Sequence, residues 1–379
     1  MDRSISKLYV SIPVDERSSA RSYPVYTGTG IMSSIGPVAS ELQLPERVII
    51  ITDTNVKQLY ASHVHSGLTH YGFRPDSITI PAGEESKTLE IVRDVYDQLH
   101  ELRCGRDIAI IALGGGVVGD LAGFVAATYY RGVPFVQIPT TLLAQVDSAV
   151  GGKVGVNVPY GKNLIGAFYQ PRFVFIDTHT LTTLPERELR SGMAEVIKYG
   201  AILDEDLFDT ITVNIDSLLQ PDVTIFPVII ERCCALKASV VEQDERESGY
   251  REILNFGHTI GHALEALTGY SVFTHGEAIT YGMMAEVHIS VNHCGLPQDD
   301  ARRLCSLLLR LSPPSIPDTL TEEQIYNAMF SDKKVRSGVV RLSLINQIGD
   351  ATFGETPDEH YIKQSIRKLF TIEKDICGY

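Results

Sequence analysis

The chain has 379 residues, 44% of them hydrophobic, and its 33 Lys and Arg against 47 Asp and Glu give a formal net charge of −14. This length suits about two domains of roughly 150 residues each. The negative charge argues against a nucleic-acid partner, whose phosphates would be repelled. No apolar run reaches the roughly 18 residues that a transmembrane helix needs, so we expect no membrane partner either.

The N-terminus and the cysteines both indicate a cytoplasmic protein. The first residues, MDRSIS, lack the basic start and apolar core of a signal peptide. The six cysteines show no CxxC spacing, so we interpret them as reduced thiols in a reducing cytoplasm rather than as a disulfide framework.

In the first half of the chain, short apolar runs alternate with helical patterns. Strands are predicted at residues 48–52, 77–80, 108–113 and 135–139, and helices at residues 86–102 and 117–129. The run at 108–113 is apolar throughout, which indicates burial on both faces. This βαβα order predicts a parallel, Rossmann-like sheet with helices on both faces.

From about residue 184, helical patterns follow one another. Helices are predicted at residues 186–199, 227–242, 258–268, 277–294 and 298–311, with one strand at 339–344. We therefore place a domain boundary near Pro185. The prediction is an α/β domain over residues 1–185 and a mainly α-helical domain over residues 186–379.

A run of three glycines, Gly114 to Gly116, follows the apolar strand and precedes a predicted helix. Glycines there let the backbone approach a pyrophosphate, and the helix presents N–H groups to it. The spacing is not GxGxxG, so a tight structural turn explains the glycines equally well. Asp53, after an earlier strand, could accept ribose hydroxyl hydrogen bonds or simply cap a helix.

Metal-ligand residue types gather in the second half. His258 and His262 are four residues apart, which places two imidazoles on one helix face. Position 259 is Thr, so the HExxH pattern of metalloproteases is absent. Glu195 and His275 add a carboxylate and a third imidazole. One carboxylate with two imidazoles suits a catalytic zinc that keeps a position open for substrate.

Cationic and amide side chains lie on the same short segments as these ligand types. Lys198 shares a helix face with Glu195, and Arg251 and Asn255 precede His258. Lys153 and Lys162 flank a glycine-rich connection and could meet phosphate or carboxylate, although solvated surface lysines are the alternative. The pattern predicts an anionic, hydroxyl-rich substrate.

In these segments the chain resembles the 3-dehydroquinate synthase family of sugar-phosphate cyclases. The resemblance runs from about Asp53 to Lys334. It is carried by the motifs GGGVVGD, DSAVGGK, GKN, GMAEVIK, LNFGHTIGH and DKK. It implies an N-terminal NAD-binding α/β domain, a helical metal- and substrate-binding domain, and a homodimer.

The resemblance also implies roles for individual residues. It assigns a zinc or cobalt ion to Glu195, His258 and His275. It places substrate or catalytic contacts at Asp147, Lys153, Lys198, Lys237, Arg251, Asn255, His262, Asn163, Lys333 and Arg131, the last reaching the partner subunit's site. It places NAD contacts at Asp53, Asn55, Glu84, Lys87, Gly115, Gly116, Asp120, Thr140, Thr141, Lys162 and Thr183.

The implied reaction converts 3-deoxy-D-arabino-heptulosonate 7-phosphate to 3-dehydroquinate and phosphate, a shikimate-pathway step toward aromatic amino acids. It runs through NAD-dependent oxidation, phosphate elimination, reduction, ring opening and intramolecular aldol closure, with no net redox change. Three alternatives remain at this point: a sibling cyclase acting on sedoheptulose 7-phosphate, a metal-dependent polyol dehydrogenase, and a non-catalytic NAD or metal sensor.

Overall fold

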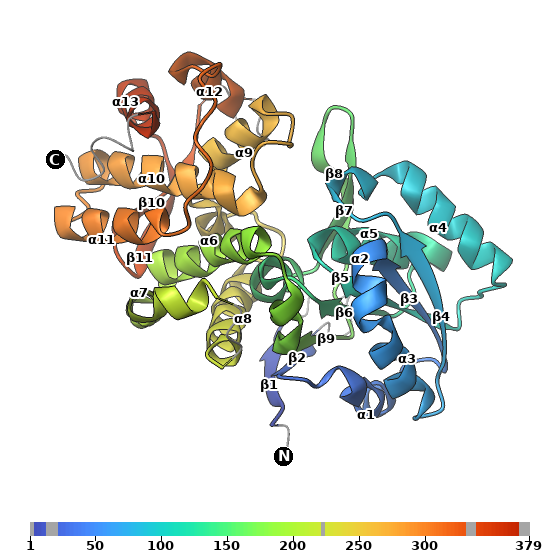
Figure 1. The fold of residues 1–379 in the computed structure, drawn as a ribbon. Coiled ribbons are helices and arrows are strands. Elements are labelled where there is room, and N and C mark those ends of the chain that lie inside the picture. The colour runs from blue at the N-terminus through green and yellow to red at the C-terminus, as the bar shows by residue number, and fades with distance from the viewer. Residues whose placement is uncertain (1–3, 13–21, 221–223, 331–338, 371–379) are drawn as a thin grey trace. The chain divides into compact units, whose positions relative to one another are not determined.

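The computed structural model describes residues 4–12, 22–220, 224–330 and 339–370 and divides into two compact units (Figure 1). The first unit comprises Met1–Leu184 and Val223–Glu245, and the second comprises Pro185–Asp222 and Arg246–Tyr379. Within the described ranges, no helix is both long and apolar enough to cross a membrane.

The first unit is built on a seven-stranded sheet in the order β1-β2-β9-β6-β5-β3-β4 (Figure 1). Its strands pair in parallel, apart from the antiparallel pair β1–β2. The strand bounds are Ser6–Val10 (β1), Tyr23–Gly28 (β2), Arg47–Asp53 (β3), Arg74–Ile80 (β4), Ile108–Gly114 (β5), Phe135–Pro139 (β6) and Phe173–Asp177 (β9). The predicted parallel sheet is confirmed, and all four predicted strands lie within observed ones.

Two apolar layers cover this sheet, because successive side chains of a strand point to opposite faces. On β3, Ile49 and Ile51 join one core cluster, whereas Val48 and Ile50 join the other. Every residue of β5 is buried, as its continuous apolar run predicts. The first cluster includes side chains of α4 (Leu89–Glu101) and α5 (Gly116–Thr128), and the second those of α1 (Ile35–Glu41) and α3 (Ser62–Thr69).

Two further helices belong to the first unit. Helix α2 (Thr54–Val56) follows β3 directly. Helix α8 (Phe226–Gln243) packs against β1, β2 and the short π-helix η5 (Ala144–Ser148). The helix predicted at residues 227–242 is therefore present, and its contacts place it in the first unit.

The glycine-rich connection after residue 151 forms a β-hairpin of β7 (Lys153–Val158) and β8 (Gly161–Phe168). A Cβ on Gly155 would lie 2.6 Å from the Ile165 carbonyl oxygen, and a Cβ on Gly166 would lie 2.3 Å from the Val154 carbonyl oxygen. These two glycines thus allow close pairing of the two strands.

The second unit is mainly helical, as predicted. Its elements are α6 (Glu186–Leu203), α7 (Glu205–Leu218), α9 (His258–Leu267), α10 (His275–His293), α11 (Gln298–Leu309), α12 (Glu322–Met329), α13 (Glu359–Leu369) and the antiparallel strands β10 (Leu342–Gln347) and β11 (Asp350–Glu355). Helix α10 contacts α6, α9, α11, α13 and β10 and is the central element of the unit. It begins with a capping box between Thr274 and Glu277.

Candidate active site

Glu195, His258 and His275 meet in the second unit. Glu195 lies in the middle of α6, and the two histidines are the first residues of α9 and α10. Glu195 Oε1 is 3.4 Å from His258 Nε2 and 3.3 Å from His275 Nε2. One donor atom from each of the three residues lies within 4.8 Å of the others. Three distant segments of sequence thus converge on one point.

The backbone before α9 fixes the position of His258. Gly257 has a φ of +80°, in the left-handed region that favours glycine, and its N–H donates to Glu286 Oε2 at 2.5 Å. The Nδ1 of His258 lies 3.1 Å from the Phe256 carbonyl oxygen. A carbonyl oxygen can only accept, so Nδ1 carries the hydrogen and Nε2 is directed to Glu195.

The cluster is strongly charged although it is buried. Glu195 has no exposed surface, and the Lys198 ammonium contacts its Oε2. Burial disfavours the carboxylate, but Lys198 and both imidazoles hold the pKa of Glu195 well below its usual range. Burial and the Lys198 charge lower the pKa of His258 to about 3. Burial opposes the charge on His275 too, yet hydrogen bonds to Glu195 and Glu265 raise its pKa to about 10.

These residues fit a divalent metal of the zinc class. One carboxylate and two imidazoles are the protein donors of many catalytic zinc sites, which reserve a further position for substrate or water. Each imidazole has its second nitrogen against an oxygen, Phe256 O for His258 and Glu265 Oε2 for His275. Such contacts orient metal-binding histidines in proteins.

His262 lies beside this cluster on α9. Its ring centroid is 5.4 Å from that of His258 and 6.0 Å from that of His275. A second group of possible donors joins His262, Glu265 and His275. Neither Glu265 nor Glu286 was predicted from the sequence. The spacing of Glu265 three residues after His262 is the only sequence signal for it.

Three more of the predicted polar residues also lie in the second unit. Arg251 and Asn255 belong to the short 3-10 helix η7 (Tyr250–Asn255), and Lys198 to α6. Only 2% of Arg251 is exposed, which is unusual for an arginine. The Asn255 side-chain amide donates to Glu247 Oε1 at 3.1 Å.

The remaining predicted substrate residues, with one exception, lie in the first unit. Lys237 on α8 donates to both the carboxylate (2.6 Å) and the carbonyl oxygen (2.7 Å) of Asp147 on η5. Lys153 begins β7 and Asn163 lies in β8, whereas Arg131 is exposed at the end of a 3-10 helix, Tyr129–Arg131. Lys333 lies outside the described residues.

The glycine turn after β5 has the form that a phosphate site needs. Gly115 is the N-cap of α5, so the first N–H groups of the helix face the turn. A Cβ on Gly115 would lie 3.0 Å from Thr141 Cγ2, and one on Gly116 would lie 3.2 Å from Ser148 Oγ. Side chains at these glycines would therefore fill the space between the turn and the segment that follows β6.

Several predicted NAD residues interact with one another. Lys87 Nζ is 2.5 Å from Asp120 Oδ2. Burial raises the pKa of Asp120 against the attraction of Lys87. Lys162 Nζ lies 4.0 Å from Glu84 Oε1, which also accepts from the side chain of Asn157 at 2.8 Å. Asn157 was not among the predicted residues, and no sequence signal singles it out.

The other predicted NAD residues have structural contacts as well. Asp53 Oδ1 accepts from the N–H groups of Asn55 (2.8 Å) and Val56 (2.9 Å), so it caps α2. The Thr183 hydroxyl is 2.5 Å from the Tyr60 hydroxyl. Thr140 donates its N–H to Gly114 O at 3.0 Å, directly after β6. Asp53 therefore has the helix-capping role that the sequence offered as the alternative to ribose binding. Its second oxygen, Oδ2, takes no part in these two hydrogen bonds.

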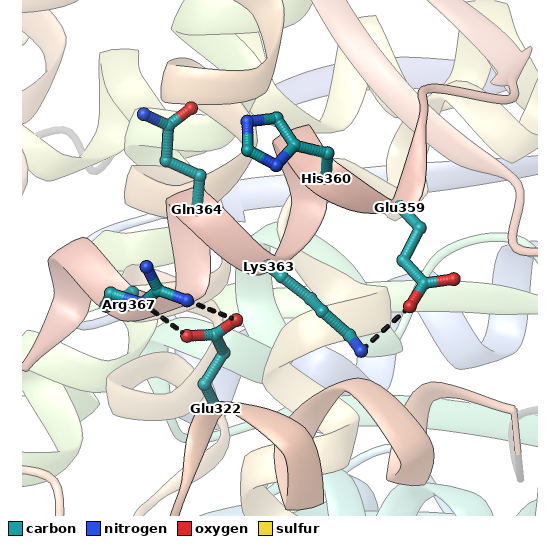
Figure 2. A pocket seen from close by; sticks show the side chains of 6 residues that line it. All are labelled: Glu322, Glu359, His360, Lys363, Gln364 and Arg367. Atoms are coloured by element: carbon teal, nitrogen blue, oxygen red, sulfur yellow. Dashed lines mark hydrogen bonds and ion pairs between the residues drawn. The ribbon is translucent and has the colours of Figure 1, made fainter.

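A groove of about 400 Å³ lies elsewhere in the second unit, between α12 and α13 (Figure 2). Figure 2 shows Arg367 directed at Glu322 and Lys363 directed at Glu359. Arg367 Nε lies 2.6 Å from Glu322 Oε2, and Lys363 Nζ lies 2.7 Å from Glu359 Oε1. The described lining residues include none of the predicted site residues. None of the groups of possible metal donors found among the described residues lies in this groove, so it is not the candidate active site.

The fold is similar to those of two solved synthases. It superposes on a 2-deoxy-scyllo-inosose synthase complexed with carbaglucose-6-phosphate, NAD+ and Co2+, with a TM-score of 0.83, 28% identity, and coverage of 95% of this chain and 99% of that one. For 2-epi-5-epi-valiolone synthase from Streptomyces hygroscopicus, with NAD+ and Zn2+ bound, the TM-score is 0.84, with 26% identity and coverage of 94% and 98%.

Sequence comparison is more specific. A family model for the 3-dehydroquinate synthase N-terminal region matches residues 77–191, and one for the C-terminal region matches residues 192–335. The 3-dehydroquinate synthase of Desulforamulus reducens is 51% identical over 330 residues, which are 87% of this chain and 92% of that protein. The chain therefore belongs to the 3-dehydroquinate synthase family and is an enzyme, which confirms the resemblance found in the motifs.

Proposed function

We propose that this chain catalyses the 3-dehydroquinate synthase reaction with a divalent metal, zinc or cobalt, held by Glu195, His258 and His275, and with NAD bound by the first unit. The observation that carries the proposal is the convergence of these three side chains on one point. The NAD+ and Co2+ or Zn2+ in the two solved cyclases support the same pair of cofactors.

The chemistry divides between the cofactors and the protein. When bound, NAD would supply the hydride acceptor and donor at carbon 5 of the substrate, and the metal would supply a Lewis acid toward hydroxyl and carbonyl oxygens. Lys198, held against Glu195, adds a positive charge beside the substrate hydroxyls. Asp147, held by Lys237, is proposed to contact the ring hydroxyls too.

Anion binding by the chain orients the substrate. We assign the substrate carboxylate to Arg251 and Lys237, and place Lys153 between the carboxylate and the phosphate. The phosphate is assigned to His262, Asn255, Asn163, Lys333 and, from the partner of a homodimer, Arg131. An oriented phosphate can take the carbon 6 proton with its own oxygen during elimination, so the protein needs to position it rather than to supply a separate base.

NAD binding is assigned to the first unit. The backbone at Gly115 and Gly116 approaches the pyrophosphate at the N-terminus of α5. The further contacts are assigned to Asp53, Asn55, Glu84, Lys87, Asp120, Thr140, Thr141, Lys162 and Thr183. The contacts of Gly115 and Gly116 with the pyrophosphate are inferred from the space at these two positions, which a Cβ would fill.

We infer the domain organisation, assembly, location and partners of the protein from the same family. We propose an NAD-binding domain over residues 1–185, to which α8 also belongs, a metal- and substrate-binding domain over the rest of residues 186–379, a homodimer, a cytoplasmic location, and no nucleic-acid or membrane partner. The net charge of −14 supports the absence of a nucleic-acid partner. The five cysteines in the described ranges form no disulfide, which suits the cytoplasm.

Phosphate release tests the proposal. The full chain, loaded with Zn2+, receives the heptulosonate 7-phosphate with NAD far below the substrate concentration, and phosphate and NADH absorbance are followed together. We expect many phosphates released per NAD with no accumulation of NADH. NADH accumulating without phosphate would instead indicate a polyol dehydrogenase, and binding without turnover a sensor.

A further inference from the structure

The buried carboxylate of Glu265 lies directly behind the metal-ligand cluster. It is on α9, with 3% of the residue exposed, and its Oε2 is 3.4 Å from His275 Nδ1. The opposite nitrogen of that ring, Nε2, is 3.3 Å from Glu195 Oε1. The two nitrogens of His275 therefore meet two different carboxylates, one in the cluster and one behind it.

We propose that Glu265 is a positioning residue for the metal site, which holds the His275 ring so that Nε2 faces the metal together with Glu195 and His258. This deepens the proposed function and rests on its metal assignment. A cation at Nε2, whether a proton or a metal ion, leaves the Nδ1 hydrogen pointing at Glu265. A carboxylate there fixes the ring orientation and increases the electron density at Nε2.

His258 shows the same arrangement with a different acceptor. Its Nδ1 meets the Phe256 carbonyl oxygen at 3.1 Å and its Nε2 meets Glu195 Oε1 at 3.4 Å. Both imidazoles thus present Nε2 to one carboxylate oxygen. The His258 acceptor is part of the backbone, so substitution cannot remove it. The His275 acceptor is a side chain, which makes the effect of positioning measurable there.

Glu265 also lies close to His262, which is assigned to the substrate phosphate. It follows His262 by three residues, so the two share a face of α9. One donor atom from each of His262, Glu265 and His275 lies within 4.8 Å of the others. The rival role for Glu265 is therefore that of a metal ligand itself, and the experiment must separate positioning from ligation.

The experiment measures metal affinity rather than activity. Full-length protein is stripped of metal and titrated with Zn2+ in competition with a chromophoric chelator, and Co2+ absorption is recorded at saturation. For Glu265→Ala we expect affinity to fall roughly 10- to 100-fold, the usual effect of losing such an orienting partner. Stoichiometry at saturation and the Co2+ spectrum should stay those of the wild type, because all three ligands remain.

A conservative variant and a matched control complete the test. Glu265→Gln keeps an acceptor oxygen in the same place, so its affinity should lie between those of wild type and Glu265→Ala. Asp204→Ala removes a buried carboxylate of the same unit that caps α7 through the Leu207 N–H, 3.1 Å away. It should lower thermal stability and leave metal affinity unchanged.

Each other outcome has a definite meaning. Unchanged affinity in Glu265→Ala, or the same loss in Asp204→Ala, overturns the positioning role. A Co2+ spectrum that changes in intensity and shape at saturation overturns it in favour of ligation by Glu265. His275→Ala, measured alongside, reports on the metal site itself. If that variant keeps wild-type affinity, the metal assignment fails, which is distinguishable from failure of the Glu265 role.

Discussion

Gly282 on α10 lies directly against the carbonyl oxygen of Gly257, the residue that precedes His258. A Cβ built on Gly282 would be 1.8 Å from that oxygen and 2.9 Å from the backbone nitrogen of Gly261. Helices α9 and α10 can approach this closely only because position 282 has no side chain. This contact sets the distance between helices α9 and α10, which carry His258 and His275.

Gly282→Ala should therefore disturb both the packing and the metal site. The atoms in the way are backbone and cannot rotate aside, so we expect a loss of about 3 kcal/mol, at the upper end of overpacking costs. Thermal unfolding and metal content check this. Gly105→Ala is the matched control, because the nearest atom to its Cβ is the end of the Asp107 side chain, which can move. Equal stability of the two variants would contradict the prediction.

His275→Ala should lose metal. It removes one of three donors and leaves Glu195 and His258 as an incomplete set. Metal analysis after dialysis should show content well below one ion per chain, with activity lost in parallel. His293→Ala, at the other end of α10 and paired with Glu355 at 3.0 Å, should keep its metal. Full metal content in His275→Ala would remove His275 from the ligand set.

Much of the fold could be predicted from the sequence because the signals are local. The apolar run of β5 and the helical period of α4 indicate burial without any knowledge of partners. The hairpin β7–β8 was not predicted, because its glycines match a loop as well as a strand pair. The ends of helices were less certain: α4 begins at Leu89, where Thr88 caps it, rather than at residue 86.

The site was predicted unevenly for a similar reason. Glu195, His258 and His275 are chemically distinctive, Glu195 and His258 lie in family motifs, and the family resemblance assigns His275 to the same metal. In the sequence Glu265 looks like any other glutamate on a helix. Only the fold shows that it lies beside His275 Nδ1. The pairing of Lys237 with Asp147 joins residues 90 positions apart, so nothing in local spacing could reveal it.

The His262→Ala variant tests whether His262 binds the substrate phosphate or the metal. His262 lies on α9 one turn after His258, yet the proposed ligand set does not include it. The variant should keep wild-type metal content and lose affinity for phosphate-bearing substrate analogues, because a charged or donating imidazole is removed. Calorimetry with such an analogue, alongside metal analysis, measures both. Metal loss in this variant would favour the His258–His262 pair as ligands.

The last prediction concerns substrate choice and rests on Arg251. The residue is 98% buried on η7, four residues before Asn255 and seven before His258. A guanidinium can bind a carboxylate through two parallel hydrogen bonds, which a compact ammonium cannot reproduce. We therefore expect the wild type to prefer the carboxylate-bearing heptulosonate 7-phosphate over sedoheptulose 7-phosphate, measured as the ratio of the two kcat/KM values.

Substitution of Arg251 should reduce that preference. Arg251→Ala should lower kcat/KM for the acid by orders of magnitude, because lost orientation also misplaces the reacting carbons. Arg251→Lys keeps the charge and should fall in between. Arg187→Ala, which removes an arginine paired with Glu277 at 2.7 Å, should leave the ratio unchanged. Equal kcat/KM for the two sugars in the wild type would overturn the carboxylate assignment, while the fold and the metal cluster would stand, because neither depends on Arg251.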